Sequence, residues 1–460
     1  MFDKSTYVTR RENLKKEVES GILLFLGNEE QGLHYADNCF RYRQDSTFLY
    51  FFGITTPGLA AVIDIDNGNE ILFGDELSMD AIVWMGNQPT LKEKASMAGI
   101  STVLPYSELK KYISKAASKG QKIHYLPTYR DEHKIKLSDL LNITFEQINP
   151  SVEFIKGVVS LRKNKTEEEI AEIEKACNIT AEMHLAAMRA LKDGMMEYEI
   201  ASVVEAAAKS RGAELSFPTI ATINGQTLHN HYYGNKANNG RMFLLDAGAE
   251  VESGYAGDMS STFPVAEKFT SQQKEIYKIQ NNMHYGAIEA LKPGRRFEEV
   301  YDLSAQIMVN DMKDLGLMKG DAVEAVKAGA HALFYPHGLG HMMGLDVHDM
   351  ENLGEVWVGY NGKPKSTQFG RKSLRLAREL EPGFVLTIEP GVYFIPELID
   401  MWRSEKRFEE FINYDEVEKY KNFGGIRNEE DYLITDDGSR RLGKRIPVFA
   451  EEVEAEKQKA

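Results

Sequence analysis

Short apolar runs punctuate the first 155 or so residues and predict an α/β domain. Their length, between Gly and Asn residues, is typical of buried strands. The charged stretch Arg10–Glu19 predicts a helix between strands. The four apolar runs expected to form strands are Ile22–Leu26, Thr47–Phe52, Ala60–Ile63 and Glu70–Phe73.

A helical pattern begins near residue 160 and marks a second domain. Thr166 and Glu169 have the spacing of a capping box, in which each side chain bonds the other residue's backbone N–H. Apolar residues then follow at helical spacing, at Ile170, Ile173 and Cys177. We therefore expect an N-terminal domain over residues 1–158, a catalytic domain over 159–448 and a polar, solvated tail over 449–460.

The second domain contains an internal repeat with an offset of 100 residues. The segment Ala190–Gly194 matches Ala290–Gly294, with one substitution. Three flanking residues (Met183, His184 and Glu199) recur at the same offset. Both copies end a predicted helix at a glycine. A duplication predicts two α/β halves related by a pseudo-two-fold axis, with a site between them that draws residues from both.

The composition is that of a globular protein, and its charge excludes some partners. The 460 residues carry a net charge of −15, which argues against nucleic acid and anionic membranes. The early apolar run Ile22–Leu26 is too short to span a bilayer. Only two cysteines, Cys39 and Cys177, are present, and no secretion signal is recognisable. A cytoplasmic protein with reduced thiols is expected.

Two aspartates flank a predicted hairpin in the first half of the repeat. Asp246 lies in the apolar run Met242–Gly248, and Asp258 follows Gly257. The two are symmetric about the turn-forming segment Val251–Gly254. An antiparallel hairpin turning there places them directly opposite or one step diagonal. Two ionised carboxylates at that distance repel and require a proton or a cation between them.

The second half supplies imidazoles and two further carboxylates. Three of the eleven histidines (His337, His341 and His348) fall within twelve residues, among glycines that indicate a crowded backbone. Imidazole is a common metal ligand. Glu389 ends one apolar run, and Glu429 begins another. A half-buried carboxylate in such a place must be paired or bound to a metal.

This pattern resembles the proline-specific "pita-bread" metallopeptidases, the aminopeptidase P and prolidase group. The resemblance covers nearly the whole chain, and its blocks are Arg41–Ser46, Val83–Gly86, His337–Asp349 and Glu381–Gly391. It implies a mixed α/β (α+β) fold, in which an N-terminal domain precedes a pseudo-two-fold pita-bread catalytic domain. It also implies two divalent ions per chain, with manganese expected and cobalt or zinc as alternatives. The implied metal ligands are Asp246, Asp258, His341, Glu389 and Glu429.

The resemblance further implies a role for each of these residues. Asp258 and Glu429 would bridge the ions, Asp246 would complete one ion, and His341 with Glu389 the other. Glu389 would also act as general base. His348 would bond the substrate carbonyl region, and His337 would line the proline pocket.

Three more residues are implied to bind substrate or assist the chemistry. The family places one histidine before the first aspartate, next to an aromatic residue. His229 fits the spacing to Asp246, whereas His231 fits the following Tyr232. Both are kept as candidates, with His229 preferred for the chemistry. Arg375 resembles a substrate-binding arginine that could pair with a carboxylate.

The expected activity is removal of an N-terminal residue that precedes proline, by an Xaa-Pro aminopeptidase acting on peptides. An Xaa-Pro dipeptidase is the nearest alternative, because the polar insertion 397–421 resembles prolidases. A non-enzymatic binding scaffold is a more distant one. Methionine aminopeptidase would not need the N-terminal domain, and creatinase lacks the metal ligands. The resemblance also implies a homodimer or homotetramer.

Overall fold

The computed structural model describes residues 2–459 and divides the chain into two compact units. The N-terminal unit contains the chain up to Arg162 together with Met350–Trp357. The catalytic unit contains Lys163–Asp349 together with the chain from Val358 onward. The chain therefore passes between the units at residues 162–163, and again around the short excursion 350–357.

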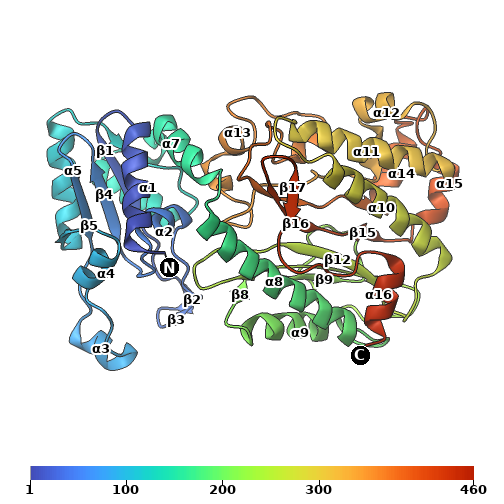
Figure 1. Cartoon of the computed structure of the whole chain (residues 1–460), viewed down its shortest axis with the longest axis horizontal. Coiled ribbons are helices and arrows are strands. Elements are labelled where there is room, and N and C mark those ends of the chain that lie inside the picture. The colour runs from blue at the N-terminus through green and yellow to red at the C-terminus, as the bar shows by residue number, and fades with distance from the viewer. Residues whose placement is uncertain (1, 460) are drawn as a thin grey trace. The chain divides into compact units, whose positions relative to one another are not determined.

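The N-terminal unit is built on a five-stranded sheet in the order β6-β5-β4-β1-β7 (Figure 1). Three of the four predicted strands are confirmed, as β1, β4 and β5. Strand β1 pairs antiparallel with β4 and parallel with β7. The strands are β1 (Ile22–Leu26), β2 (Gly32–Tyr35), β3 (Asn38–Cys39), β4 (Ala60–Asp64), β5 (Asn69–Phe73), β6 (Thr102–Leu104) and β7 (Ile123–His124). The helices are α1 (Lys4–Glu17), α2 (Ser46–Phe52), α3 (Met79–Met85), α4 (Leu91–Met97), α5 (Leu109–Ser118), α6 (Asp131–Leu141) and α7 (Val152–Arg162).

The strand predicted over Thr47–Phe52 is wrong, because this run forms helix α2. The Asp45 carboxylate accepts a hydrogen bond from Phe48 N at 2.9 Å and caps the helix. Gly53 ends it in the left-handed region, with φ of 61°. Every residue of the helix is buried. The run therefore lacks the alternation of exposed and buried positions that distinguishes helix from strand.

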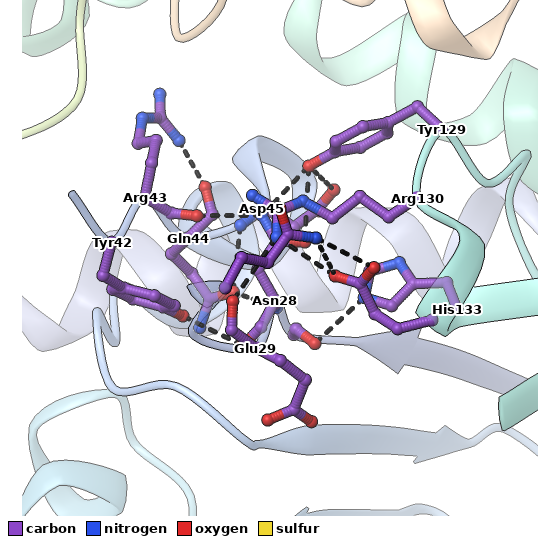
Figure 2. Close-up of polar contacts among 12 residues, drawn as sticks. Asn28, Glu29, Tyr42, Arg43, Gln44, Asp45, Tyr129, Arg130 and His133 are labelled. Atoms are coloured by element: carbon purple, nitrogen blue, oxygen red, sulfur yellow. Dashed lines mark hydrogen bonds and ion pairs between the residues drawn. The ribbon is translucent and has the colours of Figure 1, made fainter. Parts of the chain in front are cut away.

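A hydrogen-bonded polar cluster joins three loops of the N-terminal unit, and Figure 2 shows it. Gln44 Oε1 accepts from Asn28 N at 2.8 Å, and Gln44 Nε2 donates to Thr56 O at 2.9 Å. Asn28 Nδ2 donates to Arg43 O at 2.9 Å. The block Arg41–Ser46 thus holds these loops together and caps α2.

The catalytic unit repeats one arrangement of helices and strands, as the duplication predicts. Helix α8 packs on β10 and β12, and α10 packs on β13, β14 and β15 (Figure 1). The first half contains α8 (Glu167–Ala190), α9 (Glu197–Lys209), β8 (Glu214–Leu215), β9 (Ile220–Thr222), β10 (Met242–Ala247), β11 (Ala249–Glu250) and β12 (Met259–Pro264). The second contains α10 (Ser271–Glu289), α11 (Phe297–Asp314), α12 (Ala322–Ala328), α14 (Pro396–Ser404), α15 (Tyr414–Val417), β13 (Val385–Ile388), β14 (Gly391–Tyr393), β15 (Gly425–Arg427), β16 (Glu430–Ile434) and β17 (Ser439–Arg441). Helix α13 (Glu355–Val358) lies mostly in the excursion 350–357, which belongs to the N-terminal unit.

The matched repeat positions make matched contacts. Gly194 and Gly294 both have positive φ, at 88° and 81°. Gly194 N donates to Ala237 O at 2.8 Å, and Gly294 N donates to Leu380 O at 2.9 Å. Two residues after each glycine, the chain forms an isolated antiparallel bridge. The two copies therefore share one helix-to-helix connection, in agreement with a pseudo-two-fold domain.

The end of the chain differs from the predicted solvated tail. Residues Ala450–Lys457 form helix α16, which packs on α8. Val453 is fully buried, and Lys457 Nζ donates to Leu191 O at 3.2 Å. Val453 is apolar although it lies among charged residues, and charged side chains of this segment also find partners. Together these contacts explain why the segment packs on α8. Within residues 2–459, no helix combines the length and apolar character needed to cross a membrane.

Candidate metal centre and active site

One cavity of about 570 Å³ in the catalytic unit collects every residue predicted for the site. Its apolar wall includes Ile220, Leu228 and Phe369. Leu398, at the start of the insertion, and Ile395, two residues before it begins, also line the cavity, so the insertion borders it. The predicted residues that line it are Asp246, Asp258, His229, His231, His337, His341, His348, Arg375, Glu389 and Glu429.

The aspartate hairpin is confirmed, and its register sets the diagonal arrangement. Strands β10 and β12 pair antiparallel, with Asp246 opposite Ser260. Asp258 therefore lies two residues before the position opposite Asp246. Gly254 N donates to Val251 O at 2.8 Å in the turn, with Gly254 at φ of 87°. The first half of the repeat thus brings both carboxylates close together on the β10–β12 hairpin.

In the second half of the repeat, the two glutamates of the site lie at strand ends. Glu389 directly follows β13, and its N donates to Leu339 O at 2.8 Å. Glu429 directly precedes β16, and its N donates to Ser260 O at 2.9 Å in the first half. A Cβ on Gly340 would lie 2.0 Å from Thr387 O, so only glycine fits beside His341. The crowding expected from the glycines is present here.

Three ligand-type side chains come close enough to share one ion. Donor atoms of Asp258, His341 and Glu429 all lie within 4.8 Å of one another. His341 Nε2 lies 3.4 Å from Asp258 Oδ2 and 3.8 Å from Glu389 Oε1. His341 Nδ1 bonds Met342 O at 3.0 Å, so Nδ1 carries a proton. The Nε2 lone pair then faces the carboxylates, as a metal-binding imidazole requires.

The electrostatics of this cluster favour bound cations. Burial, followed by repulsion from Asp246, raises the pKa of Asp258 well above its usual range. Burial and repulsion from Asp258 raise the pKa of Glu429 in the same way. Burial raises the pKa of Glu389 to about 7, although His341 opposes the shift. Within the described residues, Asp258 Oδ1 accepts no hydrogen bond although it is buried. Divalent ions would supply the missing partners, so the residues present fit a metal centre.

Two further residues of the site were missed by sequence reasoning. Arg427 donates to Asp246 Oδ2 at 2.5 Å, to Ser260 Oγ at 3.0 Å and to Tyr393 OH at 2.9 Å. Arg427 is 3% exposed, so it is a buried cation in an acidic site. A signal was available, because Arg427 lies only two residues before Glu429 and directly follows the short run Gly424–Ile426. Tyr393, at the end of β14, carries no such local signal.

The other histidines and Arg375 occupy distinct places around the cavity. His337 Nε2 bonds Tyr393 OH at 2.9 Å, and Nδ1 bonds Gly338 O at 2.8 Å. Burial, with Arg427 nearby, lowers the pKa of His337 to about 3, so this imidazole is neutral. The rings of His341 and His348 lie 4.3 Å apart between centroids. The pKa of His229 is lowered by burial and responds to Arg427, Asp246 and Arg375, which places His229 among the charges of the site.

Comparisons with known proteins agree with this geometry. The profile of "Metallopeptidase family M24" matches residues 171–436, and that of "Aminopeptidase P, N-terminal domain" matches residues 7–124. The human Xaa-Pro dipeptidase is 32% identical, over 96% of this chain and 90% of its own length. The Escherichia coli Xaa-Pro aminopeptidase is 30% identical, over 99% and 98%.

Solved structures give the same result. A variant of E. coli aminopeptidase P in complex with substrate has a TM-score of 0.82 and 29% identity, and the match covers 100% of this chain and 99% of that one. The zinc-substituted E. coli enzyme in complex with product has a TM-score of 0.80 and 28% identity over the same shares. The architecture is therefore the expected mixed α/β fold with a pita-bread catalytic domain. This chain belongs to metallopeptidase family M24 and is a hydrolase that depends on divalent metal.

Proposed function

We propose that this protein is an Xaa-Pro aminopeptidase, which cleaves the bond between an N-terminal residue and a following proline. The observation that carries the proposal is the convergence of four carboxylates and His341 on one cavity from both halves of the repeat. Donor atoms within 4.8 Å at its centre support metal binding there. Relatives named as Xaa-Pro aminopeptidase and Xaa-Pro dipeptidase support the substrate class.

The proposed centre holds two divalent ions, with manganese as the expected metal and cobalt or zinc as alternatives. Asp258 and Glu429, which are both buried, would be the ligands shared between the ions. Asp246 would complete the ligands of one ion, and His341 and Glu389 those of the other. When bound, the ions lower the pKa of a water molecule and polarise the scissile carbonyl.

Glu389 is the proposed general base and proton carrier. Its carboxylate lines the cavity with Oε1 3.8 Å from His341 Nε2. Burial raises its pKa to about 7 in the metal-free protein. With the ions bound, the carboxylate would be ionised and able to accept a proton from water. It takes a proton from the attacking water and passes it to the leaving proline nitrogen.

The histidines and Arg427 bind and orient the substrate in this proposal. The bond before proline has no N–H to donate, so recognition must use the carbonyl and the ring. Neutral His337 is held by Tyr393, which in turn accepts from Arg427. His348 and His229 would face the carbonyl side of the bond, and His231 also lines the cavity. Apolar residues such as Leu228 and Ile395 exclude water from the proline ring of the substrate.

An Xaa-Pro dipeptidase is the second candidate, and the human relative at 32% identity favours it. Arg375 lines the cavity and could pair with the free carboxylate of a C-terminal proline. The two activities differ in whether the cavity accepts residues beyond proline. We also propose a cytoplasmic location, which the free thiols Cys39 and Cys177 support, and a homodimer or homotetramer.

Hydrolysis of two substrates, an Xaa-Pro dipeptide and an Xaa-Pro tetrapeptide, tests the proposal. Each is incubated in manganese-supplemented buffer with and without a chelator. Cleavage of the tetrapeptide supports the aminopeptidase. Cleavage of the dipeptide alone supports the dipeptidase. If neither is cut with any of manganese, cobalt or zinc, the proposal is wrong and a binding scaffold takes its place.

A further inference from the structure

A buried ion pair beside the cavity has no role in the mechanism above. Lys165 Nζ donates to Asp349 Oδ2 at 2.8 Å, and both side chains are only 1% exposed. Asp349 follows His348, which lines the cavity, but neither member of the pair is among the described lining residues. Burying two charges costs desolvation free energy, so such a pair is weak evidence for stability alone. Its place in the fold indicates a different role.

Asp349 closes the loop that carries the histidines. Asp349 N donates to Met342 O at 2.8 Å, and Asp346 N donates to Asp349 Oδ1 at 3.3 Å. Inside the loop, Gly344 N donates to Asp346 O at 3.0 Å. The loop thus begins just after His341 and ends just after His348. The carboxylate and the backbone amide of Asp349 thus both form hydrogen bonds within this loop.

Lys165 extends from a fixed base. Its backbone N donates to Gly383 O at 2.7 Å, in the turn before β13. Asn164 Nδ2 donates to Pro382 O at 2.7 Å in the same turn. The next residue, Thr166, is the N-cap of α8 and forms a capping box with Glu169, as the sequence predicts. The ammonium group is therefore placed by two rigid elements, a helix start and a strand turn.

The loop packs directly on the ion pair at Gly344. A Cβ there would lie 2.8 Å from Asp349 Oδ2 and 2.8 Å from Lys165 Cε. On its other side, Gly344 O accepts from Ala256 N at 3.0 Å, two residues before Asp258. The ion pair, the 342–349 loop and the aspartate hairpin are therefore in continuous contact.

We propose that the Lys165–Asp349 ion pair is a positioning element of the active site. It holds the 342–349 loop so that the His348 ring stays against His341 and in the cavity, at the 4.3 Å ring separation observed. Lys165 and Asp349 are positioning residues, which act through His348. This inference rests on the proposed function for its kinetic consequence but not for its structural one.

The test removes both charges together, in Lys165→Met/Asp349→Leu, because removing one would leave the other buried without its counter-ion. The double change is made with His348 present and in a His348→Ala background. With His348 present, kcat for Xaa-Pro cleavage is expected to fall by about 10²-fold. In the His348→Ala background, little further loss is expected. Losses that multiply in the two backgrounds would overturn the inference, since a general structural defect acts without His348.

A matched control and a second variant guard against misfolding. Arg189→Met/Glu456→Leu removes an ion pair from the other end of α8 and is expected to leave kcat unchanged. Gly344→Ala keeps both charges but pushes the loop off the pair. It is expected to reduce kcat with the same dependence on His348. A loss of kcat in Gly344→Ala that persists without His348 would overturn the inference.

Hydrogen exchange separates this inference from the proposed function. Amide exchange in residues 342–349 is expected to rise at least 10-fold in the pair variant and to stay unchanged in the Arg189/Glu456 control. This result would support the inference even if the wild-type protein cleaved no Xaa-Pro peptide, in which case only the function would fail. Unchanged exchange in the loop would overturn the inference whatever the activity.

Discussion

The polar cluster of the N-terminal unit is partly buried and the acidic cluster of the catalytic unit is largely buried, and the two differ in how their charges are compensated. In the N-terminal cluster, donors face acceptors, as Figure 2 shows for Asn28, Gln44 and Asp45. Glu29 pairs with Lys136, and Arg130 pairs with Glu132. In both of these pairs the opposite charges lie within contact distance of each other.

The acidic cluster lacks that balance within the protein. Four carboxylates meet one buried guanidinium, Arg427, which contacts Asp246. In addition to the effect of burial, Asp246 raises the pKa of Asp258, and Asp258 raises the pKa of Glu429. A buried cluster that satisfies itself has a structural role, whereas a buried cluster short of cations indicates a site for a ligand. The contrast therefore identifies which polar cluster is the centre of activity.

The largest expected effect comes from Glu389→Gln. The amide keeps the size of the side chain but cannot take a proton from water, so kcat should fall by about 10²–10⁴-fold. Circular dichroism should show an unchanged fold. Glu397→Gln, at the exposed start of α14, is the matched control and should retain wild-type activity. Near-native activity in Glu389→Gln would refute the assignment of the base.

Asp258→Asn should separate metal binding from folding. The neutral amide is a weaker ligand for a divalent ion, so metal analysis after dialysis should find fewer than two ions per chain. The same change removes repulsion from the buried cluster, so the metal-free variant should unfold at the same temperature as the metal-free wild type or higher. Two tightly held ions in the variant would contradict the bridging role of Asp258.

Gln44→Leu should have the opposite effect, lowering stability without changing metal binding. It removes the partner of Asn28 N, Asp45 N and Thr56 O, at about 1 kcal/mol or more for each group. The free energy of unfolding of the N-terminal unit should therefore fall by about 3 kcal/mol, while metal content stays the same. Gln31→Ala, at an exposed position, is the control. Lost metal with unchanged stability would remove the distinction between the two clusters.

The smallest effect concerns a buried imidazole, that of His331, whose surroundings favour the neutral form. His331 Nε2 bonds Tyr301 OH at 2.9 Å, and burial lowers its pKa to about 3. Below about pH 6.5 the unfolded state takes up a proton that the folded state does not, so stability falls as the pH falls. Between pH 6 and pH 4, the free energy of unfolding should fall less steeply in His331→Gln than in the wild type, by about 1.4 kcal/mol per pH unit. Urea unfolding in chelator at several pH values measures the slope, and an unchanged slope would contradict the prediction.

Much of the fold could be predicted because its signals are local. The capping box at Thr166, the glycines that end the repeated helices and the Asp246 hairpin each depend on residues close in sequence. The helix at Ser46–Phe52 could not be predicted from periodicity, because all its positions are buried. Helix α16 was missed because one buried valine, Val453, lies in a charged segment.

The candidate site shows the same limit. The resemblance supplied its residue set, and the structure brings that set to one cavity. Tyr393 and Lys165 had no local signal, because their roles depend on partners more than 30 residues away, His337 and Asp349. Charge balance in three dimensions is a property of the folded chain. Spacing along the sequence cannot reveal it.

Metal titration of chelator-stripped protein tests the central claim most directly. Manganese is added stepwise while binding is followed by calorimetry and cleavage of an Xaa-Pro tetrapeptide is measured in parallel. The account predicts two ions bound per chain, no cleavage in the stripped protein and full cleavage when the acidic cluster is filled. Cleavage that persists in the stripped protein, or manganese binding that is unchanged in Asp258→Asn, would contradict it.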